Sequence, residues 1–197
     1  MGNCLVVYGR RPADLALAAA CQERLGLPIY DHEHDPEQTG FLAEAWPCGV
    51  VLEVGPVPQG VISPLICQQT LLGLETLLDL LSEARQAPLK LRSPLRLHSH
   101  SGSLDLPRDD SGRPSACLHP ERLKSDWTAL EPGAPLFQQI NGNVIPYTGE
   151  PGQVTVFSNE AAYQEKNIAT SLARPVSIPS DPSWSQALSD VLQGVDR

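Results

Sequence analysis

In the first half of the chain, short apolar runs typical of strands alternate with longer apolar-rich stretches typical of helices. Residues 4–8 form a continuous apolar run of strand length, and residues 49–55 form a second apolar stretch that contains one glutamate; both are predicted to be buried strands. Ala- and Leu-rich stretches at 14–25 and 64–85 predict two helices, the first ending near Gly26. The order strand, helix, strand, helix predicts an α/β fold with parallel strand pairing.

The second predicted helix carries a leucine stripe. Leu71, Leu74, Leu78 and Leu81 recur every three or four residues, while acidic residues occupy the other side. This spacing predicts an amphipathic helix, whose apolar side faces a core.

The composition changes near Ala87, and the second half predicts short strands rather than helices. Asn141-Gly142 lies between apolar flanks, which predicts a hairpin turn. For the last stretch, Pro179–Arg197, an amphipathic helix and a loose tail both remain open. The short apolar segments that predict strands are Leu89–His98, Ser115–His119, Pro135–Ile140, Val144–Tyr147 and Val154–Phe157.

Composition narrows the class of protein. The chain has 197 residues, 41% of them hydrophobic, and a formal net charge of −9. Such an acidic balance argues against nucleic acid or an anionic membrane surface as the main partner. The sequence has no apolar run long enough to span a membrane and no secretory start. Five cysteines without a CxxC motif make a reducing cytoplasm the expected location.

Glu53 is the sharpest local anomaly. It lies inside an apolar strand and directly precedes the segment Val54-Gly55-Pro56-Val57-Pro58-Gln59-Gly60. A buried carboxylate is costly unless it is paired, and the carboxyl ends of parallel strands are where α/β folds bind ligands. We therefore expect Glu53 to act as a general acid–base catalyst. A strand-end glutamate that points to solvent is the alternative.

Histidines supply the candidate metal ligands. His32 and His34 lie on an acidic loop, and His98 and His100 share one face of a predicted strand. A solvated loop and an exposed polar face are the competing interpretations. His119 precedes a proline in a turn, where a structural hydrogen bond is expected.

A second anomaly is the segment Asn159-Glu160-Ala161-Ala162-Tyr163, which directly follows a predicted strand. The Tyr163 hydroxyl could donate to an anionic ligand, or it could anchor a corner of a β-barrel.

Taken together, these segments resemble the aspartoacylase/aminoacylase-3 family of zinc carboxypeptidase-like amidohydrolases. The matching motifs appear in family order between about Cys48 and Lys166, with weaker similarity from Met1. They are Leu52-Glu53-Val54-Gly55-Pro56-Val57-Pro58-Gln59-Gly60-Val61, Leu106-Pro107-Arg108-Asp109, Leu118-His119-Pro120, the segment from Asp126-Trp127 to Phe137, and the segment from Val156 to Lys166.

The resemblance implies a zinc enzyme that cleaves the amide of an N-acyl amino acid. Its pattern makes Glu53 the catalytic residue, which also contacts substrate: it takes a proton from a zinc-bound water and later delivers one to the leaving amine. Tyr163 would contact the substrate carboxylate, and Glu160 would orient that wall by hydrogen bonding. The implied fold is the second half of a carboxypeptidase-like α/β domain at 1–86, then a β-rich domain at 87–175 and a tail at 176–197.

Two departures from the family pattern change the expectation. The His- and Glu-bearing zinc motifs and the D-L-N-R substrate motif are absent, and Met1-Gly2 resembles the end of the second zinc motif. We therefore expect the C-terminal portion of a family member, without zinc ligands of its own, arising from a miscalled start or a truncated gene. The stretch Gln38–Cys48 lacks the Tyr and Arg of aspartoacylases proper, which weakens N-acetylaspartate as the specific substrate.

Two other hypotheses stay open. The chain could be a non-catalytic remnant that binds a small carboxylate or a partner subunit, or it could hold a rearranged metal site built from His32, His34, His98 or His100. A small-molecule N-acyl amino acid is the expected partner, without nucleic acid or membrane, and a homo-oligomer is left open.

Overall fold

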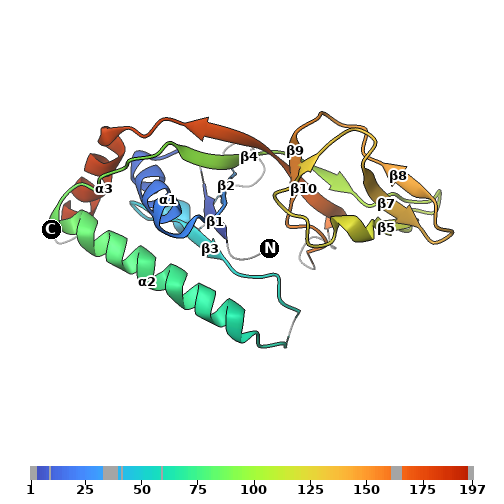
Figure 1. Cartoon of the computed structure of the whole chain (residues 1–197), viewed down its shortest axis with the longest axis horizontal. Helices are drawn as coiled ribbons and strands as arrows, with labels where there is room; N and C mark the ends of the chain where they lie inside the picture. Colours follow the sequence, from blue (N-terminus) through green and yellow to red (C-terminus); the bar gives the residue numbers. More distant parts are fainter. Residues whose placement is uncertain are drawn as a thin grey trace. The chain divides into compact units, whose positions relative to one another are not determined.

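The protein is described by a computed structural model, in which the chain forms two compact units (Figure 1). The smaller unit is His100–Pro175, and the larger unit combines Gly2–Ser99 with Val176–Arg197. The chain passes from one unit to the other within strand β4 (Leu95–Asp105) and again within β10 (Ile168–Ile178). The residues that the structure describes are 4–8, 10–32, 40, 42–58, 60–160 and 166–194.

In the larger unit, strand β1 (Cys4–Val7) is completely buried and lies between two neighbours. One neighbour is β2 (Ile29–Asp31), which runs parallel to β1 and also pairs in parallel with β4. The other is β3 (Val51–Glu53), which pairs with β1 in the antiparallel direction and ends the sheet. The predicted parallel pairing is therefore confirmed for β1 with β2 but wrong for β3.

Two helices of the larger unit begin and end where the sequence predicts. Helix α1 (Pro12–Leu25) stops at Gly26, whose φ of 68° is a left-handed conformation that suits glycine. Helix α2 (Pro64–Gln86) starts after Ser63, whose hydroxyl accepts a hydrogen bond from the Ile66 backbone N–H at 3.5 Å. A short 3₁₀ turn, η1 (Leu42–Ala45), precedes β3.

The core of the larger unit is built around α1. The Ala- and Leu-rich face of α1 is buried against β1, and Leu80 and Ala84 of α2 join the same cluster. The end of the chain forms helix α3 (Pro182–Gly194), whose Trp184 and Leu188 are also part of this core. The last stretch is thus a packed amphipathic helix rather than a loose tail. No helix in the described part of the chain is long and apolar enough to cross a membrane.

The leucine stripe of α2 does not face the core, contrary to the prediction. Leu71, Leu74 and Leu78 are 55%, 50% and 57% exposed, and only Leu81 packs partly against the core cluster. The buried side of the helix instead includes Gly73, where a Cβ would lie 3.0 Å from a methyl group of Leu52 in β3. The small residue lets the helix approach the strand closely, and this rotates the leucines outward.

The smaller unit consists of short strands and turns, as the composition predicts. Strand β9 (Gln153–Val156) pairs with β10 and with β6 (Ala129–Leu130). The hairpin predicted at Asn141-Gly142 is confirmed, with Gly142 at a φ of 89°. Strand β7 lies at the centre of a second, three-stranded sheet, which contains β5 (Ala116–Leu118), β7 (Pro135–Gln139) and β8 (Val144–Pro146).

Candidate functional site

Glu53 is the last residue of β3, and the structure gives it a different setting from the expected one. It lies opposite Cys4, the first residue of β1, and its side chain is exposed rather than buried. Because β3 is antiparallel, Glu53 lies at the end of the sheet where β1 begins, away from the carboxyl ends of β1 and β2. The predicted position at the carboxyl edge of the parallel strands is wrong, since an apolar run does not encode strand direction.

The segment after Glu53 is shaped by Gly55. Its φ is 139°, a value that L-residues rarely adopt, and a Cβ there would lie 3.2 Å from the Val57 backbone nitrogen. The chain therefore needs glycine two residues beyond the carboxylate.

Arg11 and Asp14 fix the approach to β3, and sequence reasoning missed both. The Arg11 guanidinium donates to the backbone oxygens of Ala43 and Trp46, at 2.8 and 2.6 Å. It also forms an ion pair with Asp14 at 2.6 Å, and Asp14 accepts a hydrogen bond from the Gly49 backbone N–H at 2.7 Å. An arginine and an aspartate three residues apart at the start of α1 were the available signal.

The Asp14 carboxylate has no exposed surface. Burial raises the pKa of Asp14 above its usual value, while the Gly49 N–H and the Arg11 guanidinium act in the opposite direction. The group is thus held in place by two partners in a position where its charge is poorly solvated. Both partners tie the chain before β3 to the first turn of α1, and so help to position Glu53.

In the smaller unit, strained backbone marks the start of the second predicted motif. Phe157 and Asn159 have φ values of 54° and 60°, and Asn167, just beyond the motif, has 62°. Non-glycine residues with positive φ are uncommon and cluster at functional sites. Asn159 is held by its backbone N–H, which donates to the Ala169 oxygen at 2.9 Å, and Glu160 is half-buried. Tyr163 lies outside the described residues.

Asp126 lies beside this motif. Burial raises the pKa of the Asp126 carboxyl, and hydrogen bonds from Ser158 and Phe157 oppose that shift. The Ser158 hydroxyl is 3.0 Å from that of Thr170, and the ring of Phe157 meets Trp127 edge to face at 6.3 Å. These contacts hold the strained turn from both sides; Asp126, Trp127 and Phe157 belong to motifs named from the sequence, whereas Thr170 does not.

The histidines do not converge on a metal site in the described part of the chain. His98 and His100 do lie on β4, as predicted, but on opposite sides of the division between the units. The His32 ring stacks on Tyr8 at 5.4 Å and meets Tyr30 edge to face at 4.5 Å, and His34 lies outside the described residues. No group of three or more His, Cys, Asp or Glu that could hold a metal occurs among the described residues.

Two histidines have clear structural environments. The pKa of His98 is lowered, mainly because the ring is buried, with a backbone hydrogen bond at Ile29 opposing the shift. His119 caps the short turn η2 (Pro120–Arg122), because its Nδ1 accepts a hydrogen bond from the Glu121 backbone N–H at 3.3 Å. The predicted structural role of His119 is confirmed.

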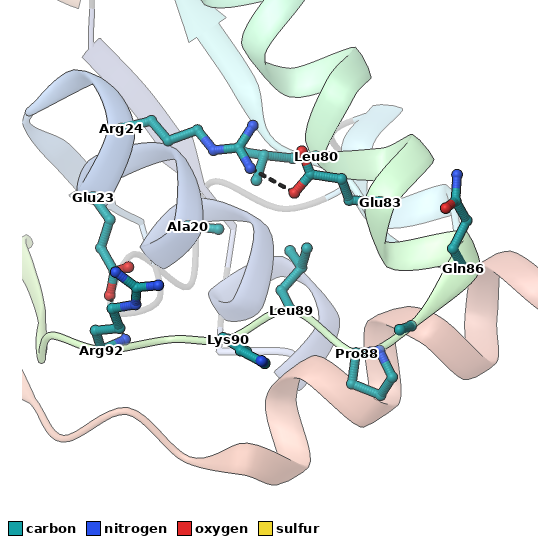
Figure 2. Close-up of a pocket in the computed structure, with 11 residues that line it drawn as sticks. Ala20, Glu23, Arg24, Leu80, Glu83, Gln86, Pro88, Leu89, Lys90 and Arg92 are labelled. Carbon is teal, nitrogen blue, oxygen red and sulfur yellow. Dashed lines mark hydrogen bonds and ion pairs between the residues drawn. The ribbon is translucent and has the colours of Figure 1, made fainter.

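A pocket of about 550 Å³ lies in the larger unit, at the C-terminal ends of α1 and α2 (Figure 2). Three of its charged side chains, those of Glu23, Arg24 and Glu83, have partners. Arg24 pairs with Glu83 at 2.5 Å across the pocket, and Glu23 accepts the Arg92 backbone N–H at 2.7 Å. None of the lining residues belongs to β3 or to the segment after it, so the pocket is separate from Glu53.

Comparison with known proteins gives a consistent picture. Residues 93–175 match the model of the AstE/AspA barrel-sandwich hybrid domain. The chain is 52% identical over 193 residues to a probable aspartoacylase of Parasynechococcus marenigrum (strain WH8102), and 50% identical over 192 residues to one of Synechococcus sp. (strain CC9605). These matches include 98% of this chain but only 64% and 63% of the relatives, so the chain spans less than two thirds of their length.

Solved structures agree with the sequence matches. Murine aminoacylase 3 superposes with a TM-score of 0.76 at 29% identity, and a glutamate-to-alanine variant of it with 0.78 at 27%. Each alignment covers 90% of this chain and 60% of the solved chain. The predicted fold class, a carboxypeptidase-like α/β part followed by a small β-rich domain, is confirmed.

Proposed function

Since the chain belongs to the aspartoacylase family, we propose that it provides the acid–base residue of a hydrolase that cleaves the amide bond of N-acyl amino acids. The observation that carries the proposal is the position of Glu53. It is an exposed carboxylate at the end of β3, held between a strand paired with β1 and a turn that requires Gly55. A carboxylate whose backbone is fixed in this way can both accept and donate a proton.

The proposed chemistry needs one group that both accepts and donates a proton. Water adds to the carbonyl carbon of the amide, and Glu53 accepts the proton that this water loses. The same proton then passes to the amide nitrogen as the C–N bond breaks. The products are a carboxylic acid and the free amino acid, and Glu53 returns to its ionised state.

Substrate recognition is assigned to the second motif. We propose that the Tyr163 hydroxyl donates a hydrogen bond to the α-carboxylate of the substrate, and that Glu160 orients this wall of the site. The strained residues Phe157 and Asn159 at its start support a functional role for the motif. Because the stretch Gln38–Cys48 lacks the Tyr and Arg of aspartoacylases proper, the side chain of the substrate need not be that of aspartate.

The resemblance also implies zinc, and the described residues do not fit it. They contain no group of three possible ligands, so no step is assigned here to a metal. We propose that the zinc ligands of the complete enzyme lie in the part of the relatives that this chain does not span. We further propose a cytoplasmic location, which five free cysteines support.

A non-catalytic, carboxylate-binding role is the second candidate, and the lack of a ligand group among the described residues favours it. One experiment separates the two. The chain is assembled with the unmatched segment of the 52%-identical relative, and release of free amine is measured from N-acetylaspartate and from N-acetyl aromatic amino acids. A hydrolase releases amine from at least one substrate, whereas a binding protein releases none.

Glu53→Gln tests the role of the carboxylate in that assembled enzyme. Because the variant keeps the shape but cannot accept a proton, kcat should fall by about 10²–10⁴-fold with the zinc content unchanged. Glu131→Gln, at another exposed glutamate, is the matched control and should keep full activity. An unchanged rate in Glu53→Gln, or loss of zinc, would contradict the assignment.

A further inference from the structure

The first two thirds of α2 present an uncovered apolar surface. Cys67, Leu71, Leu74 and Leu78, which we call the leucine face, recur at intervals of four, three and four residues and are all exposed. Ile62, just before the helix, and Leu65, in its first turn, are also exposed, at 84% and 62%. Figure 1 shows why: the last turns of α2 lie beside α3, while its first turns extend away from the other helices.

The neighbouring strand β3 is uncovered in the same unit. It ends the sheet, and within the described residues no strand pairs with its outer edge. Val54, directly after it, is 48% exposed, and the stretch Val50–Val54 contains no lysine or proline, with Glu53 as its one charged residue. Leu52 of β3 packs against α2 at Gly73, on the buried side of the helix, so β3 and α2 are direct neighbours while the leucine face points away from that contact.

An exposed surface of this kind is unusual for a monomeric protein without a binding partner. Soluble monomers rarely expose a contiguous apolar patch, and natural sheets protect their edge strands from other chains. Here a leucine-bearing helix and an unprotected strand edge occur together. A polypeptide that adds a strand to β3 and covers α2 with apolar side chains would satisfy both.

We propose that this surface binds a polypeptide segment equivalent to the part of the relatives that this chain does not match. The relatives match 98% of this chain, yet the chain covers only 64% and 63% of them, so more than a third of each relative has no counterpart here. That portion is long enough to supply both a strand and a covering layer.

A second copy of this chain fits the surface less well. Glu75 and Asp79 are exposed beside the leucine face, and the whole chain carries a net charge of −9. Pairing two copies through this face would bring rows of like charge together, which costs free energy. The inference does not rest on the proposed hydrolase activity, because it follows from exposure, strand pairing and length.

Thiol labelling tests the proposal directly, because Cys67 lies in the leucine face. The full chain is labelled with N-ethylmaleimide, alone and co-expressed with the tagged unmatched segment of the 52%-identical relative, and peptides are quantified by mass spectrometry. We expect the segment to capture this chain in equal amounts and to slow labelling of Cys67 at least tenfold. Cys117, an exposed thiol of the smaller unit, is the internal control and should label equally in both samples.

A charge in the leucine face provides a second test. Leu74→Glu places a carboxylate in the proposed interface at a half-exposed site, so the chain itself should fold normally, as judged by circular dichroism. We expect it to weaken capture at least tenfold, while Ile140→Glu, at a fully exposed isoleucine of the smaller unit, should leave capture unchanged.

Three outcomes would overturn the proposal. They are failure of the segment to capture the wild-type chain, equal labelling of Cys67 with and without the segment, and equal capture of the Leu74→Glu variant. Protection of Cys67 in the chain alone that grows with its concentration would identify a second copy as the occupant instead. All readouts are independent of turnover, so loss of the hydrolase proposal would leave this result standing.

Discussion

The Asp14 carboxylate shows how one residue ties the fold to the candidate site. Its pKa is raised by burial, so the folded state holds this proton more tightly than the unfolded state does. Its contribution to the free energy of unfolding is therefore greatest below the unfolded pKa and decreases as the pH rises through the folded pKa. Since Gly49 and Arg11 both bind Asp14, the same charge also holds the approach to β3 in place.

Urea unfolding between pH 3 and pH 7 measures this effect. Relative to Asp14→Asn, the wild-type chain should lose stability as the pH rises above 3.8, because only the wild type must ionise a buried group. Asp109 is the control of opposite sign, since hydrogen bonds from Ser111 and Arg113 lower its pKa. Its contribution should be present above pH 3.8 and disappear as the pH falls. A constant difference between wild type and Asp14→Asn at all pH values would refute the assignment.

Tyr163→Phe tests the carboxylate contact in the assembled enzyme. Loss of one charge-assisted hydrogen bond, worth about 1.5–3 kcal/mol, should raise KM roughly tenfold to a hundredfold for substrates with a free α-carboxylate. Substrates whose carboxylate is blocked should be nearly unaffected. Tyr147→Phe is the matched control: its hydroxyl lies 2.6 Å from Gln153 inside the smaller unit, so its loss should lower stability but not change KM. Equal losses on both substrate types would indicate a structural tyrosine.

Residue types alone predicted part of the candidate site. Glu53 stood out because a carboxylate in an apolar strand is rare, and His119 because it precedes proline in a turn. The i,i+3 spacing of Arg11 and Asp14 could indicate their ion pair, but not their role beside β3, since the partners there are backbone atoms more than thirty residues away. Long-range hydrogen bonds to the backbone leave no pattern in the side chains of the partner segment.

For whole helices and strands, the local sequence predicted the ends of the two long helices well. It predicted poorly how these elements pack against one another. Gly26 predicts the end of α1 through its backbone chemistry, and this is confirmed; α2 starts at Pro64 as predicted, after the Ser63 cap that the structure adds. Strand β10 was missed because Thr, Ser, Arg and Pro interrupt its apolar positions. Tertiary contacts decide the direction of β3 and the side of α2 that is buried. The spacing of apolar residues predicts neither of them.

The close contact of α2 with β3 gives a prediction at this scale. Gly73→Leu should destabilise the larger unit by about 1–3 kcal/mol, because the added atoms must displace Leu52 at a contact that already admits no more than a Cβ. Gln68→Leu, on an exposed position of the same helix, is the control and should change stability little. Chemical unfolding of both variants measures the difference. Equal stabilities would mean that α2 moves off the strand without cost.

For the whole molecule, the composition of the described part predicts the metal content. The chain alone, after dialysis against buffer without metal, should hold much less than one zinc per molecule and release no amine from N-acyl amino acids. Elemental analysis paired with an amine-release assay measures both. One tightly held zinc, with turnover abolished by His32→Ala or His98→Ala, would support the rearranged histidine site instead.

The two crossings of the chain, within β4 and β10, have a consequence for synthesis. The smaller unit is one continuous stretch, whereas the larger unit needs α3, which is made only after the smaller unit is complete. On the ribosome, residues 100–175 can therefore fold before Trp184 and Leu188 have been synthesised. These two residues complete the core around α1. Newly made α1 and β1 remain without their last helix during that interval, so part of their apolar surface stays exposed until α3 is made.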